Sequence, residues 1–318
     1  MKKILITGGF GILGTSLSTI LYKKKYKIFL LDRSKKKRKV FKAFGSKIKI
    51  IKGDFKNLNQ LKSIIKKIRV DTIIHLGAST QIMNSYKNPY DTFQTNIMGT
   101  INILEAVRTI NKNINVIFSS TVKAYGKMIN RSYKENTPLR GDLPDEVSKS
   151  AADLVAQSYA KTYDLKIGIF RSCNIYGPAD FNMDRLIPGT ILQALKGIPT
   201  KLRTSGKLKR DYLYVDDASI AYYKLMLHLK KNKKKKLFVY NLGSKYNLNS
   251  LEVVNSIYKI MKINLKPVIL NNSSIEIVAQ KIDFSKAKKE LKWAPNTSFK
   301  EGILKTIKWY KEYYQGYV

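Results

Sequence analysis

A short apolar run that leads into a glycine-rich turn constrains the fold of this chain more than any other feature. Residues 4–6 (ILI) are typical of a buried strand, and glycines follow at positions 8, 11 and 14. Glycines at this spacing let the backbone approach a ligand and let the next helix pack closely on the strand. The amino end of that helix has free N–H groups and a partial positive charge, which suit a pyrophosphate. The turn therefore predicts a Rossmann-type dinucleotide site at Gly8, Gly11 and Gly14.

An acidic residue at the end of the next apolar run supports this prediction. Asp32 follows residues 28–31, about twenty residues beyond the turn, where a carboxylate binds the ribose hydroxyls of a dinucleotide. The same carboxylate would repel the 2′-phosphate of NADP, whereas Arg33 and the lysines at 35–37 would attract it. We expect NAD to be the cofactor because the carboxylate would lie directly on the ribose.

The first half of the chain alternates apolar runs with amphipathic segments, such as the one with Phe93, Ile97, Ile101 and Leu104 at helical spacing. The predicted strands are residues 4–6, 28–31, 48–51, 72–76, 116–118 and 167–170. Short apolar strands separated by helices favour a parallel sheet covered on both faces. We therefore predict an α/β fold, with a doubly wound parallel (Rossmann) sheet in residues 1–171 plus about 211–242.

Beyond residue 177 the pattern loosens and predicts a smaller C-terminal lobe interlaced with the first domain. Helices are predicted over about 188–196, 217–230, 248–261 and 299–314, with a strand over 237–242. We assign about 172–210 and 243–318 to this lobe and expect it to bind the substrate.

The composition excludes several other classes of protein. The chain has 318 residues, 44% of them apolar, which is enough for a full hydrophobic core. It has no apolar run of transmembrane length, and a strand that begins within three residues leaves no room for a signal peptide. With Cys173 as the one cysteine and two histidines, neither an internal disulfide nor a metal site is expected. We expect a cytoplasmic protein without a membrane partner.

The net charge of +38 invites a comparison with nucleic-acid-binding proteins. Basic clusters occur at 35–39 and 230–236, but neither is interleaved with aromatic residues as a base-stacking surface would be. The pattern favours a lysine-rich, solvated surface over a specific nucleic-acid or membrane site. A field of this sign attracts phosphorylated substrates.

Hydroxyl groups and a lysine are predicted at the carboxyl edge of the sheet. Residues 119–121 (SST) follow the strand at 116–118, and hydroxyls at this edge are placed to bind a substrate alcohol. Lys149 lies in a segment where Val147 and Leu154 have helical spacing. Taken singly, the hydroxyls could merely end a strand and the lysine could be solvated.

Ordered motifs along essentially the whole chain resemble the NAD-dependent epimerase/dehydratase family of extended short-chain dehydrogenases/reductases, which acts on nucleotide sugars. Within that family the resemblance is nearest to the CDP-glucose 4,6-dehydratase type. The matching stretches are TGGFGILG (7–14), GD (53–54), HLGA (75–78), NIMGT (96–100), SSTVKAYG (119–126), SKSAAD (148–153), RSCNIYGP (171–178), RLIPGT (185–190) and RDYLYVDD (210–217).

This resemblance implies roles for individual residues. The cofactor would contact Gly8, Phe10, Gly11, Ile12, Gly14, Asp32, Asp54, Leu76, Gly77, Ala78, Asn96 and Lys149. Thr121 would contact the sugar at its oxidised carbon, and Asn174, Arg203 and Arg210 would lie toward the phosphates of the nucleotide sugar. Members of the family oxidise the sugar at C4, eliminate water or epimerise, and return the hydride. The resemblance also implies a homodimer through the helices that include 93–104 and 147–159.

The chain departs from the family pattern at two proton-transfer positions. The family has a tyrosine four residues before the lysine, where this chain has Asp145. Dehydratases have an aspartate after the threonine, where this chain has Val122, although Lys123 matches the CDP-glucose type. An aspartate is shorter than a tyrosine, and its pKa near 4 falls further beside a lysine, so it is a weak base for an alcohol.

Two hypotheses follow from these departures. In the first, the chain is an enzyme with Thr121, Lys149 and Asp145 as catalytic residues, and Glu146, Tyr125 or a tyrosine from another loop replaces the missing base. In the second, the chain binds NAD or a nucleotide sugar without turnover.

Overall fold

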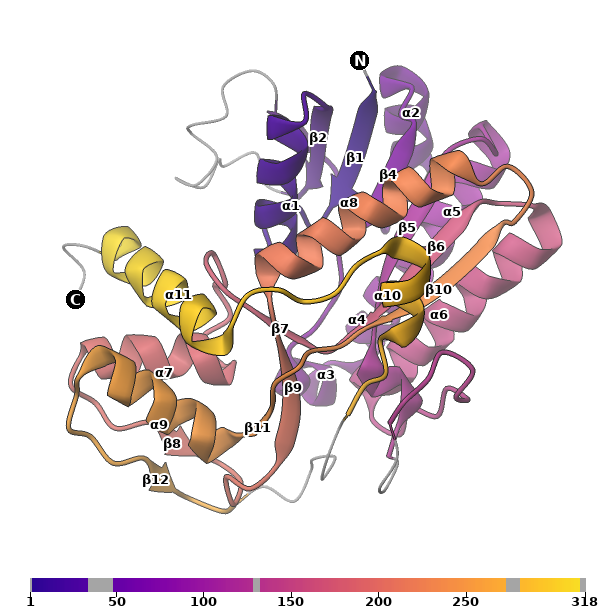
Figure 1. Ribbon diagram of the computed structural model, residues 1–318. Coiled ribbons are helices and arrows are strands. Elements are labelled where there is room, and N and C mark those ends of the chain that lie inside the picture. The colour runs from indigo at the N-terminus through magenta and orange to yellow at the C-terminus, as the bar shows by residue number, and fades with distance from the viewer. Residues whose placement is uncertain (1, 34–47, 128–131, 273–280, 315–318) are drawn as a thin grey trace.

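A parallel sheet of seven strands forms the centre of the molecule (Figure 1). The computed structural model describes residues 2–33, 48–127, 132–272 and 281–314. The strand order is β10 (Leu237–Leu242), β6 (Ile167–Ser172), β5 (Asn115–Thr121), β4 (Thr72–His75), β1 (Lys3–Thr7), β2 (Lys27–Asp32) and β3 (Ile48–Lys52). Every neighbouring pair is parallel. The predicted doubly wound sheet is confirmed, and its order reverses between β1 and β4, where open α/β sheets bind ligands.

Side chains that alternate along the strands pack against helices on both faces of the sheet. Ile4 and Ile6 of β1 belong to one core, with side chains of α1 (Ile12–Lys23) and α8 (Val215–Lys231). Leu5 between them belongs to a second core, with side chains of α2 (Leu58–Ile68), α5 (Gly99–Ile110) and α6 (Pro144–Tyr163). Burial on both faces explains why these strands are continuously apolar.

The central strand β5 is longer than predicted. Residues 119–121, expected to follow the strand, pair with Phe170, Arg171 and Ser172 of β6 and form its last three residues. The ladder to β6 thus overrides the low apolar content at this end of the strand. Thr121 is consequently held by the sheet rather than by a turn.

The segment with helical spacing at 93–104 is divided into consecutive elements. After α3 (Ile82–Lys87), the chain forms α4 (Pro89–Phe93), a π-helix η2 (Gln94–Met98) and then α5. A π-helix has i→i+5 hydrogen bonds, so the buried face shifts relative to a regular α-helix. Asn96 is buried as a result, whereas Ile97 and Ile101 are only half-buried.

The C-terminal lobe contains two small sheets and four helices in the described part of the chain. The strands are β7 (Asn174–Tyr176), β9 (Lys209–Tyr214) and β11 (Asn247–Asn249) in one sheet, and β8 (Lys201–Leu202) and β12 (Val268–Ile269) in the other. The helices are α7 (Leu186–Leu195), α9 (Ser250–Met261), α10 (Ser285–Leu291) and α11 (Phe299–Tyr313). Since β10 lies between β9 and β11 in sequence but joins the main sheet, the lobe is interlaced with it. The residue boundaries of the two domains stay a prediction.

The start of α9 shows how local contacts set an element's bounds. The apolar spacing predicts a helix from residue 248, but Leu248 pairs with Arg210 in the small sheet. Asn249 and Glu252 then form a capping box, which satisfies free N–H groups at the start of the helix. The helix therefore begins at Ser250.

Of the two lysine clusters, only the one at 230–236 lies within the described residues. The cluster at 35–39 lies outside the described residues. The cluster at 230–236 begins in the last turn of α8, where Lys230 and Lys231 are exposed and complement the negative end of the helix dipole. Over its described residues, the chain has no helix with the length and apolar character needed to cross a membrane.

Candidate active site

The predicted glycine turn folds around the amino end of α1. Gly8 has a φ of +65°, which favours glycine, and a Cβ there would lie 2.7 Å from the backbone nitrogen of Gly77. A Cβ on Gly14 would lie 2.6 Å from the Cα of Gly9, so the helix and the turn pack too closely for a side chain. Gly11 donates its N–H to the carbonyl of Gly8 (3.0 Å) and immediately precedes α1. The first N–H groups of α1 thus lie at the carboxyl edge of β1, as a phosphate site requires.

A cleft of about 980 Å³ extends from this turn along the edge of the sheet into the C-terminal lobe. Near the turn it is lined by the predicted cofactor residues Gly8, Phe10, Gly11, Ile12, Gly14, Asp32, Leu76, Gly77 and Ala78. Farther along it is lined by Thr121, Asp145, Glu146, Lys149, Asn174, Arg203 and Arg210. The fold therefore brings residues from distant parts of the sequence into one cavity.

His75 supports the floor of this cleft. It is 2% exposed, and its Nδ1 lies 2.6 Å from the hydroxyl of Thr7, which also accepts the N–H of Gly77 (3.1 Å). Burial lowers the pKa of His75 to about 3, with a smaller contribution from the charge of Lys149. A neutral His75 thus holds the loop at Gly77 against the glycine turn.

Lys149 lies on α6 with its ammonium group against the end of β5. Its Nζ donates to the carbonyl oxygen of Ser119 (3.0 Å) and lies 5.5 Å from the centre of the Phe118 ring. Burial lowers the pKa of Lys149 to about 8, although the charge of Asp153 acts in the opposite direction. A lysine with this pKa is mostly protonated at neutral pH and exchanges protons readily just above it.

Asp145 lies in the first turn of α6, where the helix dipole favours a carboxylate. Its Oδ2 lies 3.2 Å from the Nζ of Lys123, and its Oδ1 is buried without a hydrogen-bond partner among the described residues. Lys123 donates its N–H to the hydroxyl oxygen of Thr121 (3.3 Å), so this ion pair lies next to Thr121. A buried acceptor without a partner is costly, so a carboxylate oxygen in this position favours a ligand that donates a hydrogen bond to it.

Glu146 and Tyr125, the two named candidates to replace the missing tyrosine base, differ in position. Glu146 lines the cleft and is 3% exposed, and burial together with the charge of Asp145 raises its pKa. Tyr125 is absent from the described residues that line the cleft. Its hydroxyl donates to Asn241 (2.7 Å) and accepts from Arg171 (3.0 Å), and burial raises its pKa to about 12. These contacts retain Glu146 as a candidate and argue against Tyr125.

Comparison with known proteins decides the family. The family model described as GDP-mannose 4,6 dehydratase matches residues 5–306, which is nearly the whole chain. The chain belongs to the GDP-mannose 4,6 dehydratase family.

Two relatives match nearly the full length of the chain at modest identity. The chain is 30% identical, over 98% of its length, to a trifunctional UDP-glucose 4,6-dehydratase/UDP-4-keto-6-deoxy-D-glucose 3,5-epimerase/UDP-4-keto-L-rhamnose-reductase of Arabidopsis thaliana. It spans only about half of that protein, 47% of its length. CDP-paratose 2-epimerase of Salmonella typhi is 27% identical, with 96% of this chain and 98% of the epimerase covered.

A solved structure supports the same assignment. The dTDP-glucose 4,6-dehydratase of Bacillus anthracis, solved in complex with NAD, superimposes with a TM-score of 0.85 at 27% identity. The match covers 98% of this chain and 97% of the dehydratase chain.

Two residues that this family resemblance assigns to the cofactor lie outside the described lining of the cleft. The Nδ2 of Asn96 donates to the carbonyl of Ser79 (3.0 Å) and to the hydroxyl of Ser148 (2.9 Å), and its Oδ1 accepts the N–H of Ser79. The side chain therefore links the loop after β4 to α6, and its contact with the cofactor stays a prediction. The Oδ1 of Asp54 accepts the N–H of Lys56 (2.9 Å), and its adenine contact stays a prediction.

The cleft also contains polar side chains that the sequence analysis of this family member did not single out. They include Ser79, Gln81, Asp180, Arg185 and Gln193. Asp180 is 3% exposed and pairs with Arg185 (3.1 Å), and only Arg185 lies in a stretch that matches the family. Within the described residues, no group of three or more His, Cys, Asp or Glu side chains is arranged to hold a metal ion.

Proposed function

We propose that this chain is an NAD-dependent epimerase or dehydratase of nucleotide sugars that acts by transient oxidation at C4. The observation that supports this most is the single cleft, with the glycine turn at one end and Thr121, Asp145 and Lys149 farther along. Bound NAD would supply the acceptor for the sugar hydride. The residues of the chain would bind and orient the two molecules and move the proton of the sugar hydroxyl.

The residues near the glycine turn fit NAD. Side chains at Gly8 or Gly14 would fill the space that the turn needs, so the backbone can approach a pyrophosphate there. Asp32 ends β2 within the cleft, where it would bind the adenosine ribose and repel a 2′-phosphate. Lys149 would hold the nicotinamide ribose, because its ammonium is fixed at the end of β5.

The other end of the cleft fits an anionic, sugar-bearing ligand. Arg203 and Arg210 come from the C-terminal lobe, and Asn174 from β7 presents an amide to the same cavity. Guanidinium groups bind phosphates through paired hydrogen bonds, so we assign this end to the nucleotide diphosphate. The high positive charge of the chain would also raise the rate at which such a ligand arrives.

The pair formed by Asp145 and Lys123 would replace the usual tyrosine. We assign the Oδ1 of Asp145, which has no hydrogen-bond partner in the described part of the chain, as the acceptor for the C4 hydroxyl of the sugar. Thr121 would be the neighbouring hydrogen-bonding group. The ammonium of Lys123 already pairs with the other carboxylate oxygen, and a carboxylate is a weak base for an alcohol. Hydride transfer should therefore occur but be slow.

A second function, binding without turnover, is favoured by the same ion pair, because Asp145 is already paired with Lys123. The two functions are separated by mixing the protein with NAD⁺ and CDP-, UDP-, GDP- or dTDP-glucose and recording NADH absorbance. We expect NADH with one of these sugars. Tight binding of a sugar without NADH or product supports the second function, and the absence of binding to NAD⁺ and to every sugar contradicts both.

We also propose that the chain forms a homodimer through α6 and the helices beside it. Val147 and Leu154 lie seven residues apart on α6, hence on one face, and are 37% and 53% exposed. Tyr90 of α4 and Met98 of η2 are 76% and 41% exposed, and both elements pack against α6. Large apolar side chains gathered on neighbouring helices are typical of an interface.

A further inference from the structure

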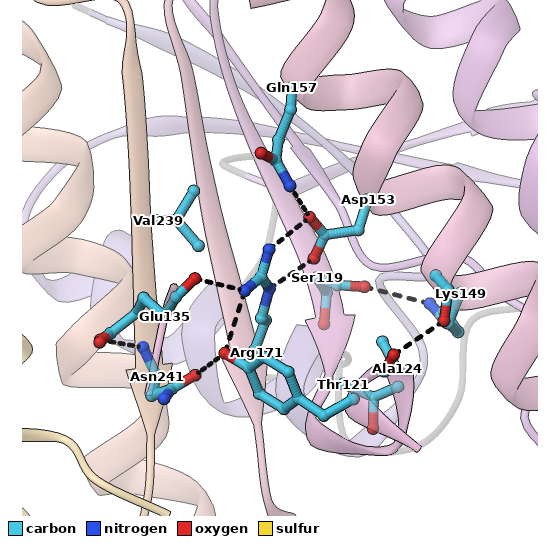
Figure 2. Close-up of polar contacts among 12 residues, drawn as sticks. Ser119, Thr121, Ala124, Glu135, Lys149, Asp153, Gln157, Arg171, Val239 and Asn241 are labelled. Atoms are coloured by element: carbon cyan, nitrogen blue, oxygen red, sulfur yellow. Dashed lines mark hydrogen bonds and ion pairs between the residues drawn. The ribbon is translucent and has the colours of Figure 1, made fainter. Parts of the chain in front are cut away.

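A buried polar cluster lies directly behind the catalytic edge of the sheet, and Figure 2 shows its members. Arg171 of β6 makes a two-pronged ion pair with Asp153 of α6, at 2.9 Å from Nε to Oδ2 and 3.0 Å from Nη2 to Oδ1. Its Nη1 donates to the hydroxyl of Tyr125 (3.0 Å) and to the carbonyl of Glu135 (2.9 Å). Arg171 and Asp153 are 2% and 0% exposed.

The cluster continues on the side of β10. Tyr125 donates its hydroxyl hydrogen to Asn241 (2.7 Å), and the backbone N–H of Asn241 donates to the carboxylate of Glu135 (2.9 Å). The amide of Asn241 donates to the carbonyls of Tyr133 and Asp283. Four of the five N–H groups of Arg171 have partners, so the guanidinium has one well-defined orientation.

Both ends of the Arg171 contacts lead to catalytic candidates. Asp153 lies one turn after Lys149 on α6. Tyr125 ends the short helix η3 (Val122–Tyr125), which directly follows Thr121. Two further hydrogen bonds hold α6 in place here: Ser150 donates to the carbonyl of Ala124 in η3 (2.9 Å), and Lys149 donates to the carbonyl of Ser119 in β5 (Figure 2).

We propose that Arg171 is a positioning residue for the reaction, which sets Lys149 through Asp153 and Thr121 through Tyr125. Stability alone does not account for such a pair, since apolar replacements of buried ion pairs are often equally stable. The ion pair gives the side chains around it a defined orientation. This matters for the reaction because displacements of about 1 Å at reacting groups cost on the order of 100-fold in rate.

The charges around Lys149 give this proposal a distinctive test. Asp153 on α6 raises the pKa of Lys149, and Arg171 lies against the same carboxylate. His75 of β4 is neutral at pH 7. Among the cleft residues on and beside this helix, Glu146 has a pKa raised by burial, and Lys123 and Asp145 are paired with each other. Replacing Asp153 by asparagine should therefore lower the Lys149 pKa, whereas replacing Arg171 by methionine should raise it.

The experiment compares Arg171→Lys, Arg171→Met, Asp153→Asn and Tyr125→Phe with the matched control Tyr240→Phe. Tyr240 is also fully buried and donates one hydrogen bond, to Glu290 (2.7 Å), but belongs to a different group of contacts. We expect hydride transfer to fall roughly 10- to 100-fold in Arg171→Lys, with sugar affinity changed less than about 3-fold. Tyr125→Phe, which keeps the ion pair, should lose less, and Tyr240→Phe should match the native protein.

The Lys149 titration is read by NMR after ¹³C-methylation, with its signal assigned by loss in Lys149→Arg. Opposite pKa shifts in Asp153→Asn and Arg171→Met support the proposal, and the milder Tyr125→Phe keeps the rate test available if either variant fails to fold. Folded variants that match Tyr240→Phe in rate and in Lys149 pKa overturn it. The inference rests on the proposed function for the reaction itself. A native protein without hydride transfer contradicts that function, while the titration still tests the positioning of Lys149.

Discussion

Replacing Asp145 by tyrosine tests whether the proposed base is a weakened version of the usual one. The phenol would extend from the first turn of α6 into the cleft, on the helix that also carries Lys149. The ammonium groups of Lys149 and Lys123 would both lower the pKa of a tyrosine from its usual value of about 10. The new hydroxyl would therefore be a better base for an alcohol than the carboxylate it replaces.

The gain in reaction rate from Asp145→Tyr can be compared with its cost in folding free energy. Positioned acid–base groups contribute on the order of 10²–10⁴ in rate, which corresponds to about 3–5 kcal/mol of activation free energy. The ion pair lost with Asp145 is a charged hydrogen bond, worth at most about 1.5–3 kcal/mol of folding free energy. It is discounted because Lys123 is 30% exposed. A typical stability of about 5–15 kcal/mol tolerates this loss.

The assay is the rate of NADH formation with the nucleotide sugar that the native protein oxidises. Asp145→Tyr should raise this rate, NAD⁺ affinity should change little, and full dehydration should need Val122→Asp in addition. Asp145→Phe is the matched control, since it adds the ring without the hydroxyl and should not raise the rate. Brisk turnover by the native protein, slowed by Asp145→Tyr and abolished by Asp145→Ala, would refute the idea of a weakened base.

Four further predictions follow from other parts of the molecule. Calorimetry should show tighter binding of NAD⁺ than of NADP⁺, owing to Asp32, and the reverse order would exclude this role. Leu154→Glu should convert dimers to monomers in light scattering, whereas the control Leu304→Glu, at an apolar residue of α11 that is 48% exposed, should leave the dimer intact. Equal molar masses for the two variants would argue against the α6 interface. Because the pKa of His75 is about 3 when folded and about 6.5 when unfolded, the unfolded chain binds the proton first as pH falls through 6.5. The free energy of unfolding should therefore drop by roughly 2 kcal/mol from pH 7 to pH 5, and urea melts of His75→Gln should lack this loss. Binding to duplex DNA should be indifferent to sequence and fade with salt; a specific complex that survives at about 0.2 M salt would contradict this.

The parts of the fold that are predictable from sequence have local causes. The glycine turn follows from the spacing of Gly8, Gly11 and Gly14, and the central strands follow from burial on both faces. The end of β5 is not predictable in this way, because residues 119–121 join the strand only through pairing with β6. The π-helix likewise has no periodic pattern of its own, and it accounts for the burial of Asn96.

In the candidate site, too, some features are predictable from the sequence and others depend on tertiary contacts. Family motifs identify Thr121, Lys149 and the substitution at Asp145, and the structure brings all three to one cleft. The pairing of Asp145 with Lys123 depends on the approach of η3 to α6, which no spacing in the sequence encodes. Tyr125 is near Thr121 in sequence, yet its contacts with Arg171 and Asn241 emerge only from tertiary packing.

The central claim, oxidation of a nucleotide sugar at C4 within this cleft, is tested most directly by following the hydrogen itself. The protein is incubated with NAD⁺ and a nucleotide sugar that carries deuterium at C4, and the nicotinamide is analysed by mass spectrometry. We predict deuterium on the nicotinamide of the reduced cofactor, with less label when Lys149 is replaced by methionine. A sugar that binds tightly, with no deuterium on the nicotinamide after prolonged incubation, would contradict the account.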